Sequence, residues 1–156
     1  MLTGPGVVSA RRTLGELAPL FRHPVPASRQ SELVYETFSM SPQAPAGSHE
    51  LLAATTVLHP GWLEDEPFMT RGHFHIDPRL GESMLTLSGE GVLVLMNRSG
   101  EVQEHPADPG TFFRIEGEWA HRAVNRSRAP WVFLVTWDAD CGHDYESISP
   151  SSFRLR

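Results

Sequence analysis

Short runs of hydrophobic and β-branched residues, mostly separated by turns with Gly or Pro, make up the chain after residue 50. Runs of this length, bounded by turn-forming residues, are typical of β-strands. We predict strands at 51–58, 68–76, 83–87, 92–96, 101–105, 111–115, 120–125 and 131–137. The sequence Ser88-Gly89-Glu90-Gly91 between two of them is typical of a hairpin turn. This spacing predicts an all-β sandwich or barrel.

The first part of the chain has a weaker pattern, and residues 1–12 predict no element. Thr13 and Glu16 have the spacing of a helix capping box, and apolar residues recur at helical spacing after Thr13. We therefore predict a short helix near residues 13–21. A looser alternation over 32–38 predicts one more strand.

The length of 156 residues suggests a single domain that can bury its own core. We expect an N-terminal segment with the short helix at 1–31, an antiparallel β-barrel at 32–148 and a C-terminal tail at 149–156. Hydrophobic residues make up 40% of the chain and charged residues 21%, which is typical of a globular protein.

Charge and composition exclude several function classes. The net charge of −6 argues against a nucleic-acid partner. All 13 basic residues are Arg, so chemistry that needs a lysine Schiff base or a P-loop lysine is excluded. Cys141 is the only cysteine, which rules out an internal disulfide. No apolar run approaches a membrane span and no signal peptide is recognisable, so we expect a cytoplasmic protein without a membrane partner.

The clearest candidate chemistry is His73-Phe74-His75 followed by Glu82. On a strand, residues i and i+2 point to the same face, so the two imidazoles would project side by side. The Asp77–Gly81 segment favours a turn that brings Glu82 back beside them. Two nitrogens and a carboxylate oxygen can bind a divalent metal ion. The alternative is a histidine pair on a surface strand and an unrelated exposed glutamate.

A third histidine, His121, lies in a late predicted strand and would complete such a site. The spacings His73-x-His75-x6-Glu82-x6-Gly89 and Gly110-x10-His121-x3-Asn125 resemble the two motifs of the cupin superfamily. The second motif differs from the general form, because Glu116 and Glu118 stand where cupins commonly have Pro and Gly.

A narrower resemblance covers about residues 34–148. The blocks 55–61, 70–75, 120–125 and 142–145 are similar to those of cupin-type glucose-6-phosphate isomerases. This resemblance implies a cupin barrel, a homodimer, a small-molecule substrate and an aldose–ketose isomerase of carbohydrate metabolism (glycolysis or gluconeogenesis). The apolar strand at 33–38 could cover an edge in such a dimer.

The resemblance also implies the site residues. One divalent ion per chain (Fe, Mn, Ni, Co or Zn) would be bound by His73, His75, Glu82 and His121. Thr56, Thr70 and Gly72 would bind phosphate, and His143 would lie near the substrate. The base that moves the proton would be Glu82, with His143 and Glu66 as the other candidates.

This chain departs from that family at three positions where a tyrosine is usual, which are Leu80, Met84 and Trp137. Each loses a phenol that could bind sugar or phosphate, and Met84 and Trp137 predict a more apolar pocket wall. Two alternatives therefore stay open. One is a metal-dependent oxygenase, lyase or epimerase that acts on a less polar substrate, and the other is a non-catalytic cupin that binds a metabolite.

Overall fold

The computed structural model describes residues 1–41, 43, 45–149, 152 and 153. The described chain is built from thirteen β-strands and three short 3₁₀ helices. The strands are β1 (Val7–Thr13), β2 (Leu33–Met40), β3 (Leu51–Leu58), β4 (Trp62–Leu63), β5 (Glu66–Pro67), β6 (Phe74–His75), β7 (Glu82–Ser88), β8 (Gly91–Met96), β9 (Val102–Ala107), β10 (Phe112–Ile115), β11 (Ala120–Val124), β12 (Trp131–Asp138) and β13 (His143–Asp144). The 3₁₀ helices are η1 (Ala18–Leu20), η2 (Ala27–Arg29) and η3 (Ala139–Cys141).

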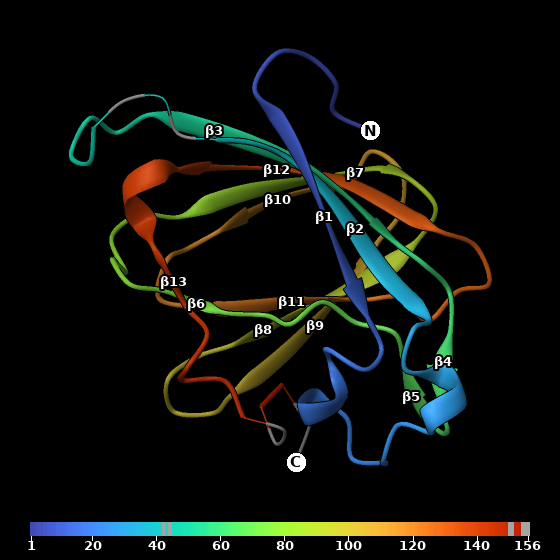
Figure 1. Ribbon diagram of the computed structural model, residues 1–156. Helices are drawn as coiled ribbons and strands as arrows, with labels where there is room; N and C mark the ends of the chain where they lie inside the picture. The colour runs from blue at the N-terminus through green and yellow to red at the C-terminus, as the bar shows by residue number, and fades with distance from the viewer. Residues whose placement is uncertain (42, 44, 150–151, 154–156) are drawn as a thin grey trace.

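Two antiparallel sheets form the body of the protein. The large sheet has the order β1-β2-β3-β12-β7-β10 and the small sheet the order β11-β8-β9, while β13-β6 and β4-β5 are two-stranded. Figure 1 shows the large sheet facing the small one, with β6 running beside β11. The predicted all-β antiparallel fold is confirmed. Among the described residues, no helix is long and apolar enough to span a membrane.

The predicted N-terminal helix is wrong. The capping-box pair does form, since the Thr13 amide donates to Glu16 Oε2 at 2.7 Å, but only turns and η1 follow it. The amides of Leu14 and Gly15 bond instead to the carbonyls of residues 32 and 30. Pro19 has no amide proton to extend a helix. Backbone pairing to a distant segment thus replaces the helical hydrogen bonds.

An additional strand, β1, occupies a region where the sequence predicted no element. It pairs with β2 from Val7↔Met40 to Thr13↔Leu33 and lies at the edge of the large sheet. Most of its residues are exposed, so it lacks the alternation that marks a half-buried strand.

The predicted hairpin at 88–91 is also wrong. β7 pairs with β10 and β12 in the large sheet, whereas β8 pairs with β9 and β11 in the small one. The turn therefore carries the chain from one sheet to the other. Its two glycines fit closely against β12, because a Cβ on Gly91 would lie 2.1 Å from the Trp131 ring and one on Gly89 would lie 2.2 Å from the Pro130 carbonyl oxygen.

The segment predicted as a strand at 68–76 is only partly regular. Only Phe74–His75 forms a strand, although Met69 and His73 make isolated bridges to Val124 and His121. Gly72 interrupts the segment with a φ of 73°. The segment nevertheless follows β11, and this brings its histidines beside His121.

The core lies between the two sheets. Its largest fully buried side chains include Trp131, Phe68, Leu58, Met84 and Leu93. Asn125, also fully buried, fastens the end of β11, because its Nδ2 donates to the carbonyls of Leu58 and Ala129 at 2.9 Å each. Of the tail predicted at 149–156, residues 150, 151 and 154–156 lie outside the described residues.

Candidate metal centre and substrate cavity

The two histidines of the H-x-H sequence lie side by side. Their ring centroids are 5.6 Å apart and the rings are stacked, with an angle of 24° between their planes. Nδ1 of His75 is 2.5 Å from the Leu80 carbonyl oxygen, to which it can donate. The turn that follows supplies this acceptor, because the Leu80 amide donates to the Asp77 carbonyl. This contact fixes the ring and directs Nε2 toward the site.

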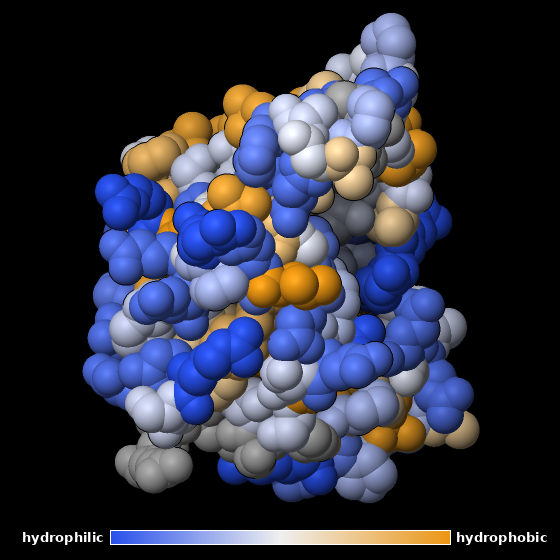
Figure 2. Space-filling model, turned by 90° about the vertical axis from the view of Figure 1, so that its left-hand side faces the viewer, coloured by the Kyte–Doolittle hydropathy of each residue, from blue (hydrophilic) through white to orange (hydrophobic). Residues whose placement is uncertain are grey.

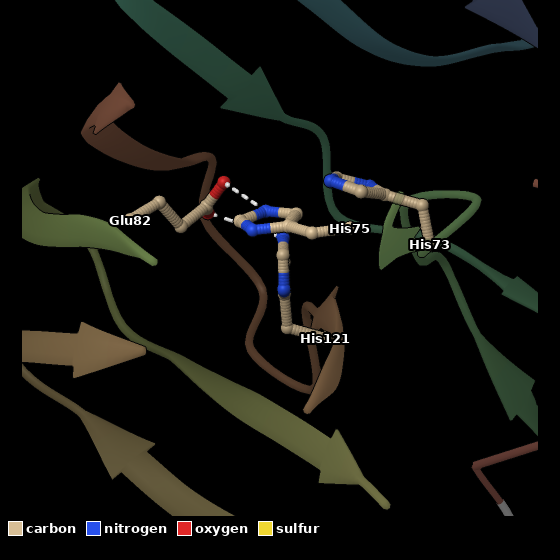
Figure 3. A group of neighbouring side chains, drawn as sticks. All are labelled: His73, His75, Glu82 and His121. Atoms are coloured by element: carbon tan, nitrogen blue, oxygen red, sulfur yellow. Dashed lines mark ion pairs between the residues drawn. The ribbon is translucent and has the colours of Figure 1, made fainter. Parts of the chain in front are cut away.

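His121 and Glu82 reach the same point from the two sheets. His121 comes from β11 of the small sheet and Glu82 begins β7 of the large sheet. Nε2 of His121 is 3.1 Å from Glu82 Oε1, and Nε2 of His75 is 3.5 Å from Glu82 Oε2. Figure 3 shows the carboxylate directed at these two imidazoles, with His73 beyond them. The four predicted ligands thus converge.

These four residues, called here the inner group, fit a divalent ion. One ligand atom from each lies within 4.8 Å of the others. The Nε2 atoms of His73, His75 and His121 are buried and have no hydrogen-bond partner in the described part of the chain. Two of these nitrogens contact the Glu82 carboxylate only as ion pairs, and the third, on His73, lies beside them. Three nitrogens around one carboxylate are a ligand set that a divalent metal ion would complete.

The pKa shifts of His73 and Glu82 in the inner group also favour binding of a divalent ion. Burial, reinforced by nearby His121, lowers the pKa of His73 to about 2, so its imidazole is neutral. Burial alone would raise the pKa of Glu82, but the surrounding imidazoles more than offset it, and its pKa is well below the usual range. Burial lowers the pKa of His75, yet Glu82 and the Leu80 carbonyl outweigh that and raise it.

A cavity of about 240 Å³ opens beside the inner group. Each predicted substrate contact lies on its wall: Thr56, Thr70, Gly72, Met84, Trp137 and His143. Leu80 is not on this wall and acts through its carbonyl. Glu66 is also elsewhere, because it accepts a hydrogen bond from the Arg22 amide at 2.6 Å and lines a separate groove.

His143 lies beside the inner group. β13 pairs with β6, with His143 opposite His75, and the His143 ring centroid is 4.3 Å from that of His73. Burial chiefly lowers the pKa of His143, which leaves a neutral imidazole able to accept a proton.

Five polar cavity residues were not assigned from the sequence: Tyr35, Thr37, Ser39, Arg71 and Tyr145. The first three alternate along β2 and share one face, so period-two spacing was their signal. Tyr145 follows His143 by two residues, and its ring centroid is 5.3 Å from that of His73. The cavity therefore has two phenols, although Met84 and Trp137 are apolar.

The rest of the cavity wall is largely apolar. Met84, Phe133, Val135 and Trp137 come from β7 and β12, and Leu93 comes from β8. The site thus combines a metal-binding end, a hydroxyl-rich wall and an apolar wall.

A second group of possible ligands, called here the outer group, consists of His49, Asp138 and Asp140. It joins the loop before β3 to η3, on the side of the molecule seen in Figure 2. Polar residues cover most of that face. His49 is exposed, and its Nδ1 lies 2.8 Å from Asp138 Oδ2.

Comparison with known proteins gives one consistent family. A family model described as "Glucose-6-phosphate isomerase (GPI)" matches residues 11–152. The glucose-6-phosphate isomerases of Thermococcus kodakarensis and Pyrococcus horikoshii are each 38% identical to this chain over 125 residues. The matched region covers 80% of this chain and 65% of each relative, so the chain spans about two thirds of their length.

Solved structures resemble the fold at low identity. A Lactobacillus farciminis oxalate decarboxylase in complex with formate superposes with a TM-score of 0.56 at 18% identity, over 74% of this chain and 31% of that one. A Cupin_2 domain of an Enterobacter cloacae XRE-family regulator gives a TM-score of 0.50 at 16% identity, over 67% and 96% of the two chains. These likenesses show a cupin fold.

Proposed function

The chain belongs to the cupin-type glucose-6-phosphate isomerase family, and we propose that it is a metal-dependent isomerase that interconverts an aldose phosphate and its ketose. One observation carries the proposal. Three buried imidazole nitrogens without hydrogen-bond partners in the described chain converge on Glu82 at the end of a cavity with a hydroxyl-rich wall.

We assign the four inner-group side chains as ligands of one divalent ion, with Fe, Mn, Ni, Co and Zn as candidates. When bound, such an ion would polarise the adjacent oxygens of an α-hydroxycarbonyl and make the C–H bond between them more acidic. His75 and His121 are held by β6 and β11, and His73 is held by a backbone bridge to His121. The Leu80 carbonyl fixes the tautomer of His75.

His143 is the better candidate for the base. Both oxygens of Glu82 lie beside imidazoles of the inner group, whereas His143 lines the cavity with a neutral ring. In this assignment His143 removes the proton from one carbon, exchanges it with solvent and protonates the neighbouring carbon, while the hydroxyl proton moves from one oxygen of the substrate to the other. Glu82 would then contribute to catalysis as the negatively charged ligand of the metal ion.

Thr56, Thr70 and Gly72 suit a phosphate group. The Thr70 hydroxyl oxygen accepts the Ala123 amide at 3.0 Å, so its proton stays available to donate. Gly72 lies on the cavity wall, and it packs so closely against Phe153 that a Cβ would come 2.9 Å from that ring. These are uncharged contacts, which position an anion by hydrogen bonds.

The test uses metal-free protein reloaded with each candidate ion. We expect fructose 6-phosphate to be converted to the aldose in D₂O with incorporation of solvent deuterium at the carbon that changes. His143→Gln should lower kcat by about 100-fold or more while one ion per chain is still bound. Absence of both turnover and deuterium exchange with every ion would refute the isomerase.

The apolar wall favours one second candidate, which is a metal-dependent oxygenase, lyase or epimerase that acts on a less polar substrate. Met84→Tyr and Trp137→Tyr separate the two. If a sugar phosphate is the substrate, either added phenol should raise kcat/KM by about 10-fold, the value of one hydrogen bond to a charged group. Oxygen consumption without isomerisation would favour an oxygenase.

A homodimer is part of the proposal. β1 is an edge strand whose outer side pairs with no other strand of the described chain, and edge strands of this kind are commonly covered. Sedimentation at micromolar concentration should give about twice the 17.4 kDa chain mass. A mass of one chain would contradict the dimer.

A further inference from the structure

Among the described residues, Arg71 is the one permanently cationic side chain on the cavity wall. Six other arginines pair with carboxylates, which are Arg11, Arg22, Arg29, Arg79, Arg114 and Arg126. Arg71 forms no ion pair within the described ranges. Its guanidinium carbon instead lies 4.7 Å from the centroid of the Tyr145 ring.

Stacking on an aromatic ring leaves the edges of a guanidinium open. The ring contacts the flat face of the group, while the N–H donors point outward in the plane. Those donors have the fork geometry that binds a phosphate or carboxylate through two hydrogen bonds. The contact with Tyr145 therefore positions the Arg71 side chain and leaves its N–H donors able to bind an anion.

The backbone of Arg71 is fixed at the cavity wall. Its carbonyl accepts Nη2 of the buried Arg122 at 2.8 Å. The amide of the preceding residue, Thr70, donates to the Ala123 carbonyl of β11, and the Ala123 amide donates to the Thr70 hydroxyl. Gly72 follows in a left-handed conformation. The exposed side chain therefore starts from an anchored point.

Arg71 lies near the inner group but is separated from it by one aromatic ring. Tyr145 contacts Arg71 on one side and has its ring centroid 5.3 Å from that of His73 on the other. One aromatic ring thus separates the cation from the metal-binding end. The single carboxylate on the cavity wall, Glu82, is at that end beside His75 and His121.

We propose that Arg71, held by Tyr145, binds the anionic group of the substrate at the cavity wall and makes the site select a phosphorylated sugar over a neutral one. This inference rests on the proposed isomerase function for its substrate. It assigns the charge recognition to Arg71, which is distinct from the uncharged contacts of Thr56, Thr70 and Gly72.

Binding of an unreactive ligand tests the inference separately from catalysis. Calorimetry would compare sorbitol 6-phosphate with sorbitol, using metal-loaded protein. We expect Arg71→Gln to weaken sorbitol 6-phosphate binding by about 10- to 100-fold, the loss of one charge-assisted contact, and to leave sorbitol unchanged. Arg71→Lys should recover part of the affinity for sorbitol 6-phosphate. Tyr145→Phe keeps the aromatic ring beside Arg71, so it should keep the wild-type affinity. In turnover, Arg71→Gln should raise KM far more than it lowers kcat.

Arg98→Gln is the matched control. Arg98 is also exposed and stacks on a ring, with its guanidinium carbon 4.4 Å from the Phe74 centroid, but it does not line the cavity. The Arg98→Gln variant should bind sorbitol 6-phosphate with the affinity of the wild type. Equal affinities of Arg71→Gln and wild type, equal losses in both arginine variants, or no binding of sorbitol 6-phosphate by the wild type would each overturn the inference. If the wild type isomerises no sugar phosphate but Arg71→Gln still loses affinity, the proposed function fails and the role of Arg71 stands.

Discussion

The inner and outer groups have similar donor chemistry in opposite surroundings. Both combine imidazole with carboxylate, and in each the ligand atoms lie within 4.8 Å of one another. In the inner group, three residues are buried and the imidazole Nε2 atoms have no hydrogen-bond partner in the described chain. In the outer group, His49 is exposed and the carboxylates already accept hydrogen bonds.

The contacts of the outer group explain what it does. Asp140 accepts the amides of Gly47 at 2.7 Å and His49 at 2.9 Å, and Asp138 accepts the Asp140 amide at 2.8 Å. These bonds fasten the loop before β3 to η3. Proximity of ligand atoms therefore does not distinguish the two groups, whereas burial and the absence of hydrogen bonds to the imidazole Nε2 atoms do.

Removal of one ligand from each group should give the largest difference. His121→Ala should lose the bound ion, because no neighbour of His121 can replace its nitrogen, whereas His49→Ala should keep one ion per chain. An ion at 100 times its Kd should stabilise the wild type by about 2.7 kcal/mol and His121→Ala by far less. Metal content after dialysis and denaturation with and without the ion measure this. A full equivalent in His121→Ala, or its loss in His49→Ala, would contradict the comparison.

The glycine beside each group allows a second comparison. Gly72 and Gly47 both have left-handed backbones, with φ of 73° and 85°. A Cβ on Gly47 would meet nothing within 4 Å, but one on Gly72 would lie 3.0 Å from the His121 carbonyl oxygen as well as against Phe153. Gly47→Ala should lose about 1–2 kcal/mol from backbone strain alone. Gly72→Ala should lose about 1–3 kcal/mol more through overpacking.

Chemical denaturation measures both losses, and metal titration of the same variants extends the test. Because the clash at Gly72 involves the backbone of a ligand residue, Gly72→Ala should also weaken metal binding, while Gly47→Ala should not. Equal destabilisation in the two variants would show that packing around Gly72 is looser than the structure indicates.

The inner group was predictable because its signal is local spacing combined with a family motif. His73, His75 and Glu82 are close in sequence, and His121 was assigned through the second motif. The residues that line the cavity were less predictable from the sequence than the inner group. Tyr35 alternates with Thr37 and Ser39, but which face of β2 lines the cavity depends on its pairing with β1 and β3.

The errors in the fold have a common physical cause. The capping box around Thr13 and the turn at Gly89 were interpreted from local sequence, yet their outcome depends on distant partners. Backbone pairing with residues 30 and 32 replaces the helix, and β7 and β8, on the two sides of the turn, belong to different sheets. Local propensity predicts that a turn forms, and tertiary contacts decide what it connects.

The smallest expected effect is a pH dependence of stability in the outer group. The hydrogen bond to Asp138 raises the pKa of His49 above its usual 6.5, and the amides of Gly47 and His49 lower the pKa of Asp140, which stays ionised. The folded protein therefore holds the His49 proton more tightly than the unfolded chain. This stabilisation is fully present below the unfolded pKa and is lost as pH rises through the folded pKa. Denaturation midpoints of wild type and His49→Asn, compared from about pH 5.5 to about pH 8.5, should differ at the acidic end and converge at the alkaline end. Because the His49 side chain is 65% exposed, the difference should be smaller than that between the two glycine variants. A gap that widens as the pH rises would show that this contact does not stabilise the loop through the protonated imidazole.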